Sequence, residues 1–313
     1  MKVVVTGGAG FIGANTCRLL AEHNIEAVAL DDLSSGFRSN LEGIGATLVE
    51  GSILDDTALD EVLPGADAVI HLAARPSVPR SIADPWSAHE VNATGTVKVL
   101  EAVRRHDVGQ VVVASSSSVY GANPTLPKQE DLTLRPVSPY AASKLATETY
   151  TLAWGSSYGI KTLAFRFFNV FGPLQPAGHA YAAVVPAFVD AALAGRPLPV
   201  NGDGSQSRDF TFVDSVASVL TRAVTDRTHS PLPVNLAFGT RTTLLELIGE
   251  LETILGHPLE REHREPRAGD VPHSQADQTR FRSLFPDVEP TPLPEALART
   301  VAWFRSTGAG AAT

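Results

Sequence analysis

A glycine-rich segment directly after the first strand pattern constrains the fold of this chain more than any other feature. A strand is expected at Lys2–Thr6, the segment reads Gly7-Gly8-Ala9-Gly10-Phe11-Ile12-Gly13, and a helix is expected at Phe11–His23. Glycine permits a tight turn, close approach of the backbone to a pyrophosphate, and close packing of helix on strand. The helix N-terminus then faces the phosphates. This order predicts a dinucleotide site; the plainer alternative is a glycine-rich turn without a ligand.

Short apolar runs that predict strands recur between helical patterns throughout the first half of the chain. Because continuous apolar strands are buried on both faces, they indicate a parallel sheet covered by helices. The predicted class is α/β, a Rossmann-type doubly wound parallel sheet with a smaller mixed α/β C-terminal lobe. Further strands are expected at Ala27–Leu30, Thr47–Val49, Ala68–Leu72, Val111–Ala114 and Thr162–Phe165, and helices at about Pro85–Arg105 and at Pro139–Ser157.

Glycine and proline become frequent after about residue 170, which predicts a different organisation for the second half. We expect a dinucleotide-binding domain at residues 1–170 and a substrate-binding lobe at residues 171–313. The chain is expected to return to the first domain around residues 208–237. Helices are expected at about Ala182–Ala194, Val213–Thr225, Thr243–Leu255 and Pro294–Arg305, with a short strand at Val234–Leu236.

Charge and composition narrow the class of partner. The 313 residues carry a formal charge of −9, which argues against nucleic acid or an acidic membrane as a ligand. Cys17 is the single cysteine, so no internal disulfide is possible and a reducing, cytoplasmic location is predicted. No signal peptide or membrane-spanning run is expected, and histidines, acids and the cysteine lack metal-ligand spacing. His71 follows a buried strand pattern, so a structural role is expected for it.

Asp31 ends the second predicted strand, 18 residues after Gly13. A carboxylate at this place holds the adenosine ribose of a dinucleotide through its hydroxyl groups. The same carboxylate repels a 2′-phosphate, so the sequence favours NAD over NADP.

Tyr140 and Lys144 stand four residues apart in a predicted helix, and the serine run Ser115–Ser118 precedes them. This spacing puts both side chains on one helix face. A neighbouring ammonium is expected to lower the pKa of the phenol, which ordinarily lies near 10, by about three units. The pair therefore predicts a tyrosine that exchanges protons with a substrate hydroxyl, although such pairs also occur by accident on helix surfaces. Lys144 is one of only five lysines, against 20 arginines, which is mildly suggestive.

Over nearly its whole length the chain resembles the extended short-chain dehydrogenase/reductase family. The resemblance rests on the glycine loop, Tyr140 and Lys144, and also on His71-Leu72-Ala73-Ala74, Arg166-Phe167-Phe168-Asn169-Val170-Phe171-Gly172-Pro173, Gly202-Asp203-Gly204 and Arg208-Asp209-Phe210. One departure is Ser52, where the family usually has aspartate. The resemblance implies a tightly bound, recycled NAD held by Gly7, Gly10, Phe11, Ile12, Gly13, Asp31, Asp32, Ser35, Gly36, Ile53, Leu72, Ala73, Ala74, Asn92, Tyr140, Lys144 and Phe167.

Within this family the residues before Val119-Tyr120-Gly121 distinguish the reactions. Related dehydratases carry acidic residues there as general acid and base, whereas this chain has Ser117 and Ser118. Elimination is therefore disfavoured, and the chain looks like a nucleotide-sugar 4-epimerase of the UDP-glucose or UDP-N-acetylglucosamine type. Ser116, Ser117, Tyr140 and Lys144 are then the expected catalytic residues. The resemblance implies substrate contacts by Ser77, Ser116, Ser117, Tyr140, Asn169, Ala183, Val184, Pro199, Val200, Asn201, Arg208, Arg267, Asp270 and Ser274.

Ser274 stands where a residue of the 4-epimerases walls the 2-position of the sugar. A small residue there admits an N-acetyl group, so both plain and N-acetylated UDP-hexoses are predicted substrates. The alternatives are a UDP-glucuronate 4-epimerase, a 4-ketoreductase, or a sugar-nucleotide-binding regulator without activity. The resemblance also implies a homodimer formed by the helices at about 85–105 and 139–157.

Overall fold

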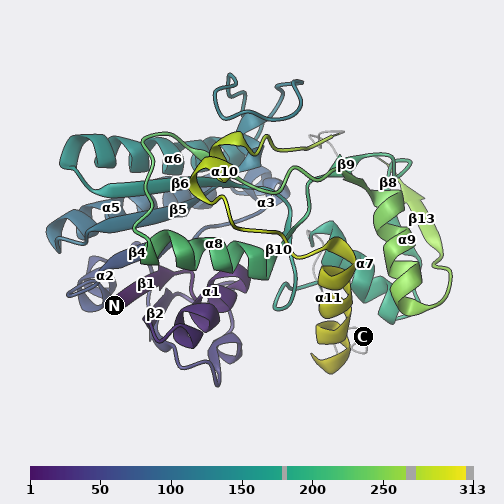
Figure 1. Cartoon of the computed structure of the whole chain (residues 1–313), viewed down its shortest axis with the longest axis horizontal. Helices are drawn as coiled ribbons and strands as arrows, with labels where there is room; N and C mark the ends of the chain where they lie inside the picture. Colours follow the sequence, from purple (N-terminus) through teal and green to yellow (C-terminus); the bar gives the residue numbers. More distant parts are fainter. Residues whose placement is uncertain (178–181, 266–272, 308–313) are drawn as a thin grey trace.

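A seven-stranded sheet organises the first domain, with six strands from residues 2–167 and a seventh from residues 234–236 (Figure 1). The computed structural model describes residues 1–177, 182–265 and 273–307. The strands stand in the order β11-β6-β5-β4-β1-β2-β3, and all neighbours are parallel. The predicted α/β class is confirmed. The strands are β1 (Lys2–Thr6), β2 (Glu26–Asp31), β3 (Thr47–Glu50), β4 (Ala68–His71), β5 (Gln110–Ser116), β6 (Lys161–Phe167) and β11 (Val234–Leu236).

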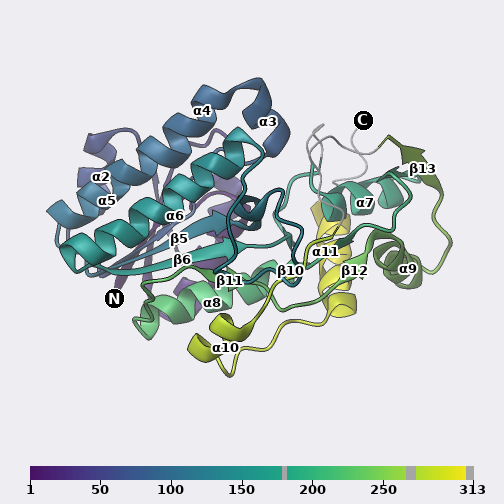
Figure 2. The same ribbon diagram turned by 90° about the horizontal axis from the view of Figure 1, so that it is seen from above.

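Helices cover both faces of this sheet (Figure 2). Val3 and Val5 of β1 pack in one cluster with α1 (Phe11–Glu22) and α8 (Val213–Thr225), whereas Val4 packs in another with α2 (Asp56–Val62). Successive side chains of a strand point to opposite faces, so an unbroken apolar strand needs an apolar cover on each side. The helices α5 (Gly95–Arg105) and α6 (Pro139–Tyr158) complete the second cover.

The sheet grows in opposite directions from β1, because β2 lies on one side of it and β4 on the other. In open parallel sheets ligands bind outside the carboxyl ends of the strands at such a reversal. The glycine segment follows β1 at this point. The strand order therefore places the predicted dinucleotide site at the reversal.

The helix expected at about Pro85–Arg105 is interrupted by a π-helical turn. It consists of α4 (Pro85–His89), the turn η2 (Glu90–Thr94) and α5. Asn92 lies in this turn, and its side chain bonds the backbone of Arg75 in both directions. Single π turns commonly mark functional places in helices. Here the turn presents Asn92 to the segment that follows β4.

The C-terminal lobe is built from short elements around α7 (Val184–Leu193), α9 (Leu244–Leu255) and α11 (Leu293–Thr307). A phenylalanine-rich core joins these helices. Thr243 begins α9 with a capping box that includes Glu246. The remaining elements are η1 (Arg38–Leu41), α3 (Val78–Ala83), η3 (Ser117–Tyr120), β7 (Val170–Phe171), β8 (Leu198–Asn201), β9 (Ser207–Arg208), β10 (Thr211–Phe212), β12 (Thr242–Thr243), β13 (Arg261–Arg264) and α10 (Thr279–Leu284).

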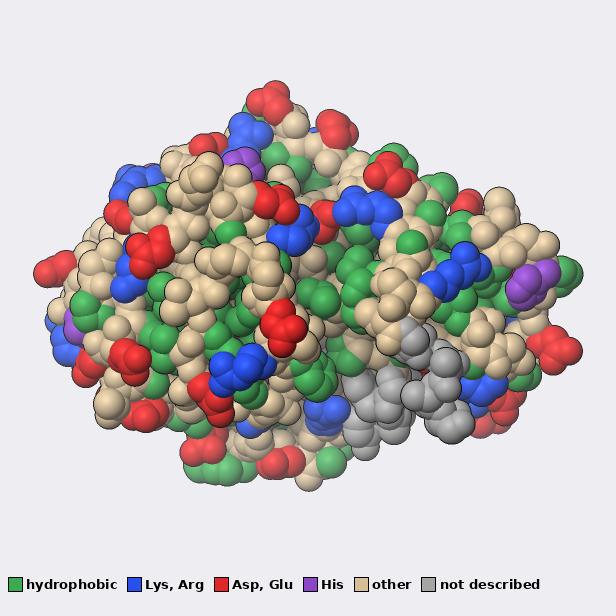
Figure 3. Space-filling model, turned by 90° about the horizontal axis from the view of Figure 1, so that it is seen from below, with side chains coloured by type: hydrophobic (Ala, Val, Ile, Leu, Met, Phe, Trp, Pro, Cys, Tyr) green, Lys and Arg blue, Asp and Glu red, His purple; other side chains and the backbone are tan. Residues whose placement is uncertain are grey.

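The surface of the described residues gives two further facts. None of the helices among them has the length and apolar composition needed to cross a bilayer. On the face drawn in Figure 3, acidic and basic side chains are interspersed and no large area carries one sign.

His71 at the end of β4 is expected to make the fold acid-sensitive. Its ring contacts Thr6 Oγ1 at 2.7 Å and Thr96 Oγ1 at 3.1 Å, and burial lowers its pKa to about 3. Because the unfolded chain binds this proton near pH 6.5, the stabilisation is full above that pH and is lost as pH falls toward 3. From pH 7 to pH 5 the ring should contribute a loss of about 2 kcal/mol. Urea unfolding of wild type and His71→Asn at both pH values tests this; equal pH dependences would contradict it.

Candidate active site

The glycine loop is held tightly against the segment that follows β4. Gly7 has φ of +70°, and a Cβ atom there would lie 2.7 Å from the backbone nitrogen of Ala73. A Cβ atom on Gly13 would lie 2.1 Å from the carbonyl oxygen of Gly7. These approaches explain the spacing of the glycines. Gly10 begins α1 without a side-chain cap, so the first-turn N–H groups remain available to a ligand.

Two carboxylates lie at the end of β2, beside the glycine loop. Asp31 is buried and accepts hydrogen bonds from the Ala9 and Leu33 N–H groups, both at 2.9 Å. Burial raises the pKa of Asp31, and these backbone bonds oppose the increase. Asp32 forms an ion pair with Arg75 at 3.6 Å. Since Arg75 follows β4, the pair spans the carboxyl end of β1.

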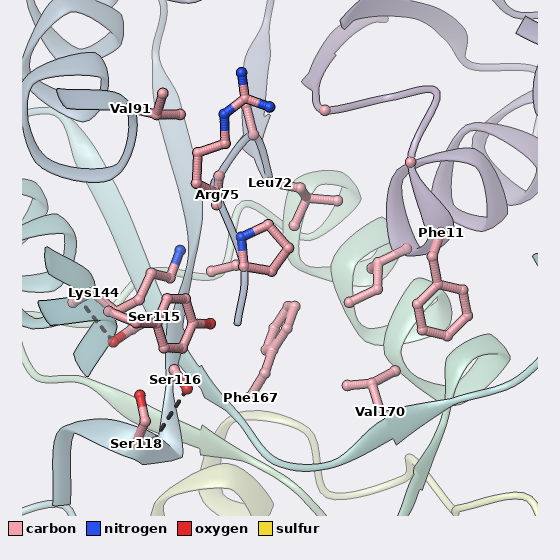
Figure 4. A pocket seen from close by; sticks show the side chains of 18 of the residues that line it. Phe11, Leu72, Arg75, Val91, Ser115, Ser116, Ser118, Lys144, Phe167 and Val170 are labelled. Atoms are coloured by element: carbon pink, nitrogen blue, oxygen red, sulfur yellow. Dashed lines mark hydrogen bonds between the residues drawn. The ribbon is translucent and has the colours of Figure 1, made fainter. Parts of the chain in front are cut away.

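A cavity of about 770 Å³ begins at the glycine loop and extends to Tyr140, Arg208 and Ser274. Figure 4 shows Phe11, Leu72 and Phe167 on its wall, with Ser116 and Lys144 from β5 and α6. All residues predicted to bind the dinucleotide line this cavity except Gly36 and Asn92. Of those predicted to bind substrate, the cavity is lined by Ser116, Ser117, Tyr140, Asn169, Arg208 and Ser274.

Tyr140 and Lys144 reach the cavity from the first turns of α6. Ser138 caps this helix, and the Tyr140 N–H donates to Ser81 Oγ at 3.0 Å. The Ser116 hydroxyl lies close enough to the phenol to act on its pKa. The Lys144 carbonyl accepts from Ser115 Oγ at 3.3 Å, a contact drawn in Figure 4. The structure thus brings the serine at the end of β5 and the tyrosine–lysine pair together.

The expected lowering of the phenol pKa by Lys144 is wrong for the chain by itself. Burial raises the pKa of Tyr140, and the Ser116 hydroxyl opposes this increase. Burial also lowers the pKa of Lys144 to about 8. Both charged forms lose hydration on the wall of the cavity, and this effect exceeds the benefit of their proximity. Before a ligand enters, Tyr140 is therefore protonated at neutral pH, and Lys144, with a pKa of about 8, still carries its charge there for the most part.

The other serines of the run have different surroundings. Ser117 and Ser118 lie in η3 and line the cavity. The Ser118 N–H donates to Ser116 Oγ at 3.2 Å, which orients the serine nearest the phenol. The Ser118 hydroxyl itself is buried without a hydrogen-bond partner. A polar ligand in the cavity would satisfy it.

Several predicted contacts lie behind the wall of the cavity. Gly36 backs the loop, since a Cβ there would lie 2.8 Å from the Ala9 carbonyl carbon. Asn92 is buried and bonds Arg75 and Ser143, so it positions the wall. Ser77 caps α3 by accepting from the Arg80 N–H. Asn92 and Ser77 bond groups of the protein and Gly36 has no side chain, which explains why these residues do not line the cavity.

A second cavity of about 230 Å³ shares Asn169 and Arg208 with the first. Ala183, Val184, Pro199 and Asn201, which are predicted to contact the nucleotide of the substrate, also line it. Val200 does not, because its side chain points into the core of the lobe with no exposed surface. Arg267 and Asp270 lie outside the described residues.

Two cations on the wall of the large cavity were not predicted from the sequence. Arg75 follows the alanines after β4, and Lys128 lies in the loop between η3 and α6. Both lie in irregular segments, where no periodicity indicates the direction of a side chain. One sequence signal was available for Lys128: lysine is rare in this chain, so each lysine is a candidate for a specific role.

A model of the NAD dependent epimerase/dehydratase family matches residues 3–237. The chain belongs to this family. UDP-glucose 4-epimerase of Mycolicibacterium smegmatis is 39% identical over 98% of this chain and 99% of that protein. A UDP-N-acetylglucosamine 4-epimerase structure from Methanobrevibacter ruminantium, in complex with UDP-N-acetylmuramic acid, is 35% identical over 98% of both chains, with a TM-score of 0.93. The UDP-glucuronic acid 4-epimerase of Bacillus cereus, in complex with UDP-glucuronic acid and NAD, has a TM-score of 0.89 at 27% identity, over 98% of this chain and 100% of that one.

The chain is therefore an NAD-dependent nucleotide-sugar epimerase or dehydratase. Relatives that act on different sugars match it over the same length. The large cavity suits NAD, because the uncapped start of α1 offers N–H groups and Asp31 offers a carboxylate on the same wall. Gly7, Gly10, Gly13 and Asp31 would hold the adenosine and pyrophosphate half.

Gly13→Ala is expected to abolish retention of NAD. The new Cβ cannot be accommodated 2.1 Å from a backbone oxygen, so the loop must move away from its position at α1. We expect purified protein to lose most of its bound NAD, measured by chromatography of the nucleotide released on denaturation. Gly249→Ala in α9 is the control, because its Cβ would meet no atom within 4 Å. Equal NAD contents in the two variants would contradict the assignment of the loop.

Proposed function

We propose that this protein is an NAD-dependent 4-epimerase of UDP-hexoses, acting on UDP-glucose and UDP-galactose and on their N-acetylated counterparts. The observation that carries the proposal is the group at the end of β5 and the start of α6. It offers the half-buried tyrosine Tyr140, the neighbouring Ser116 hydroxyl and the buried Lys144. Serines occupy positions 117 and 118, where elimination would need acids.

Tyr140 is the proton-exchanging group of the proposed reaction. The reacting form of Tyr140 is its phenolate, whose oxygen accepts the proton of the sugar 4-hydroxyl, and the phenol so formed later returns that proton to the 4-keto oxygen. Ser116 donates a hydrogen bond to the same sugar oxygen, and the Lys144 ammonium stabilises the phenolate. When bound, NAD supplies a reversible hydride acceptor beside C4. Between the two transfers the keto sugar would turn over, so that the returning hydride would meet the opposite face of C4.

The rest of the substrate is assigned to the junction of the lobes. Arg208 and Asn169 border both cavities, which suits a diphosphate that connects a sugar in the large cavity to a nucleotide in the small one. The arginine fork matches phosphate oxygens. Because the reaction has no net redox change, NAD is proposed to remain bound through the turnover.

The experiment that tests the function is incubation of purified protein with UDP-glucose, UDP-galactose, UDP-GlcNAc or UDP-GalNAc without added NAD, followed by chromatography. The expected result is conversion within each pair of 4-epimers. A 4-ketoreductase would instead consume added NADH, and a regulator without activity would leave every sugar unchanged. Either outcome contradicts the proposal.

Ser274→Tyr is expected to exclude N-acetylated sugars. Ser274 is 7% exposed and lines the large cavity, where its N–H donates to the Ser207 carbonyl at 3.0 Å. A tyrosine would fill the space proposed for the N-acetyl group. We expect kcat/KM for UDP-GlcNAc to fall by about tenfold or more, with little change for UDP-glucose. Ser283→Tyr on the exposed side of α10 is the control. Equal losses for both sugars would contradict this placement.

We also propose a homodimer formed through α5 and α6. Tyr150 and Tyr158 on α6 are 43% and 52% exposed, and both rings contact Trp154. Exposed aromatic residues on adjacent turns favour a protein contact. Light scattering should give the mass of two chains for wild type and of one chain for Tyr150→Glu.

A further inference from the structure

Lys128 lies on the wall of the large cavity beside the segment that carries Ser274. Its N–H donates to the Gln275 carbonyl at 2.8 Å, and its carbonyl accepts from the Asp277 N–H at 2.9 Å. The Asn235 side chain also donates to this carbonyl, at 2.7 Å. These bonds hold the backbone of Lys128 in place on both sides. Lys128 lines the same cavity as Ser116 and Tyr140, and its ammonium is held by a hydrogen bond to the Asn123 carbonyl.

The ammonium of Lys128 is a buried cation without a carboxylate partner among the described residues. The residue exposes 6% of its surface, and its ammonium donates to the Asn123 carbonyl and lies 6.0 Å from the centre of the Tyr120 ring. Glu130, two residues later, instead accepts from the Asn235 N–H at 2.9 Å. Burial lowers the pKa of Lys128, and no ion pair opposes it. A buried charge without a counter-ion is unfavourable unless a ligand supplies one.

The charges around the cavity are unevenly distributed. Among the described residues that line it, the acids are Asp31 and Asp32, both beside the glycine loop. Lys128 and Arg208 line the cavity beside the Ser274 segment, since Lys128 bonds Gln275 and Ser207 bonds Ser274, and Lys144 lies on the helix of Tyr140. In the proposed function Arg208 binds the diphosphate and Lys144 acts with Tyr140. The positive charge of Lys128 then has no role toward the sugar.

We propose that Lys128 binds a carboxylate carried by the sugar, so that the enzyme accepts acidic nucleotide sugars beside neutral ones. The inference rests on the proposed function, because it places the sugar at the Tyr140 end of the cavity. The carboxylate has two possible positions, C6 of a hexuronate or a lactyl ether on O3. A charge-assisted bond in a buried site favours such a ligand by about tenfold to a hundredfold.

The test compares wild type, Lys128→Met and Lys161→Met, the last a change at an exposed lysine of β6. Turnover is measured with UDP-glucose and with UDP-glucuronate, and UDP-N-acetylmuramate is measured as a competitive inhibitor of UDP-glucose turnover. We expect wild type to bind at least one of the two acidic sugars. Binding of UDP-glucuronate would place the carboxylate on C6, and binding of UDP-N-acetylmuramate would place it on the lactyl ether at O3. In Lys128→Met, kcat/KM or affinity for that sugar should fall by about tenfold or more, with UDP-glucose changed by less than about threefold.

The proposal is overturned if wild type binds neither acidic sugar, or if Lys128→Met loses neutral and acidic sugars equally. Should Lys128→Met fail to fold, Lys128→Arg and Lys128→Gln replace it, and only the arginine variant should keep the acidic sugar. Failure of the proposed function is a separate result, because it would appear as a wild-type protein that leaves UDP-glucose unchanged.

Discussion

Replacement of Tyr140 by phenylalanine is expected to lower kcat for epimerisation by about 10²–10⁴-fold. The variant removes the phenol oxygen of Tyr140. In the proposed reaction this is the atom of the Ser116, Tyr140 and Lys144 side chains that takes the proton from the sugar oxygen and returns it. Ser116 retains its hydroxyl, but a serine without an activating base does not take a proton near neutral pH. The measurement is single-turnover conversion of UDP-glucose, monitored by chromatography.

The fold and the bound dinucleotide should persist in Tyr140→Phe. The ring of Tyr140 keeps its packing, and its N–H still donates to Ser81 Oγ. Tyr158→Phe is the matched control, because Tyr158 lies on the same helix with 52% of its surface exposed. If Tyr140→Phe turned over UDP-glucose as fast as Tyr158→Phe, the proton-transfer role of Tyr140 would be wrong.

Glu148→Ala is expected to lower the free energy of unfolding by about 3–5 kcal/mol. Glu148 on α6 and Arg166 on β6 form a buried bidentate pair, with distances of 2.9 and 2.7 Å and side chains that are 3% and 2% exposed. Arg166 also donates to the Tyr120 hydroxyl and to the Glu130 carbonyl. Removal of the carboxylate leaves the guanidinium buried with half of its partners.

Urea unfolding at pH 7 measures this change, and Glu101→Ala is the control. Glu101 pairs with Arg104 on the surface at 2.9 Å, so its loss should change stability by less than about 1 kcal/mol. The Glu148–Arg166 pair also ties the helix of Tyr140 to the sheet, so Glu148→Ala should reduce kcat as well. If Glu148→Ala and Glu101→Ala lowered the free energy of unfolding by similar amounts, the buried Glu148–Arg166 pair would contribute no more to stability than the surface pair.

The elements that position the catalytic group were predictable because their sequence patterns are local. Strands β1 and β11 and helix α8 have the predicted bounds, and the other five predicted strands and the long helices differ from the observed bounds by a few residues. An apolar run between turn residues needs no knowledge of distant contacts to become a buried strand. The short strand β13 was not predicted, because all four of its residues are exposed and polar.

The pKa values in the site were not predictable in the same way. The four-residue spacing correctly placed Tyr140 and Lys144 on one face, but the sign of the phenol shift depends on burial by β5, α3 and the cavity wall. Asn92 and Val200 show the same limit. The sequence places each near the site, while tertiary contacts turn one toward Arg75 and the other into the core.

The sequence by itself determined the parallel sheet, the glycine loop after its first strand, and the serine, tyrosine and lysine proposed as the catalytic group. These depend on periodicity and on spacing within single elements, which are properties of the local chain. Only the tertiary structure decided which charges face the cavity and which are neutralised. Lys128 illustrates this difference, because its role depends on the absence of a described carboxylate partner in space, and a partner in space has no fixed distance along the sequence.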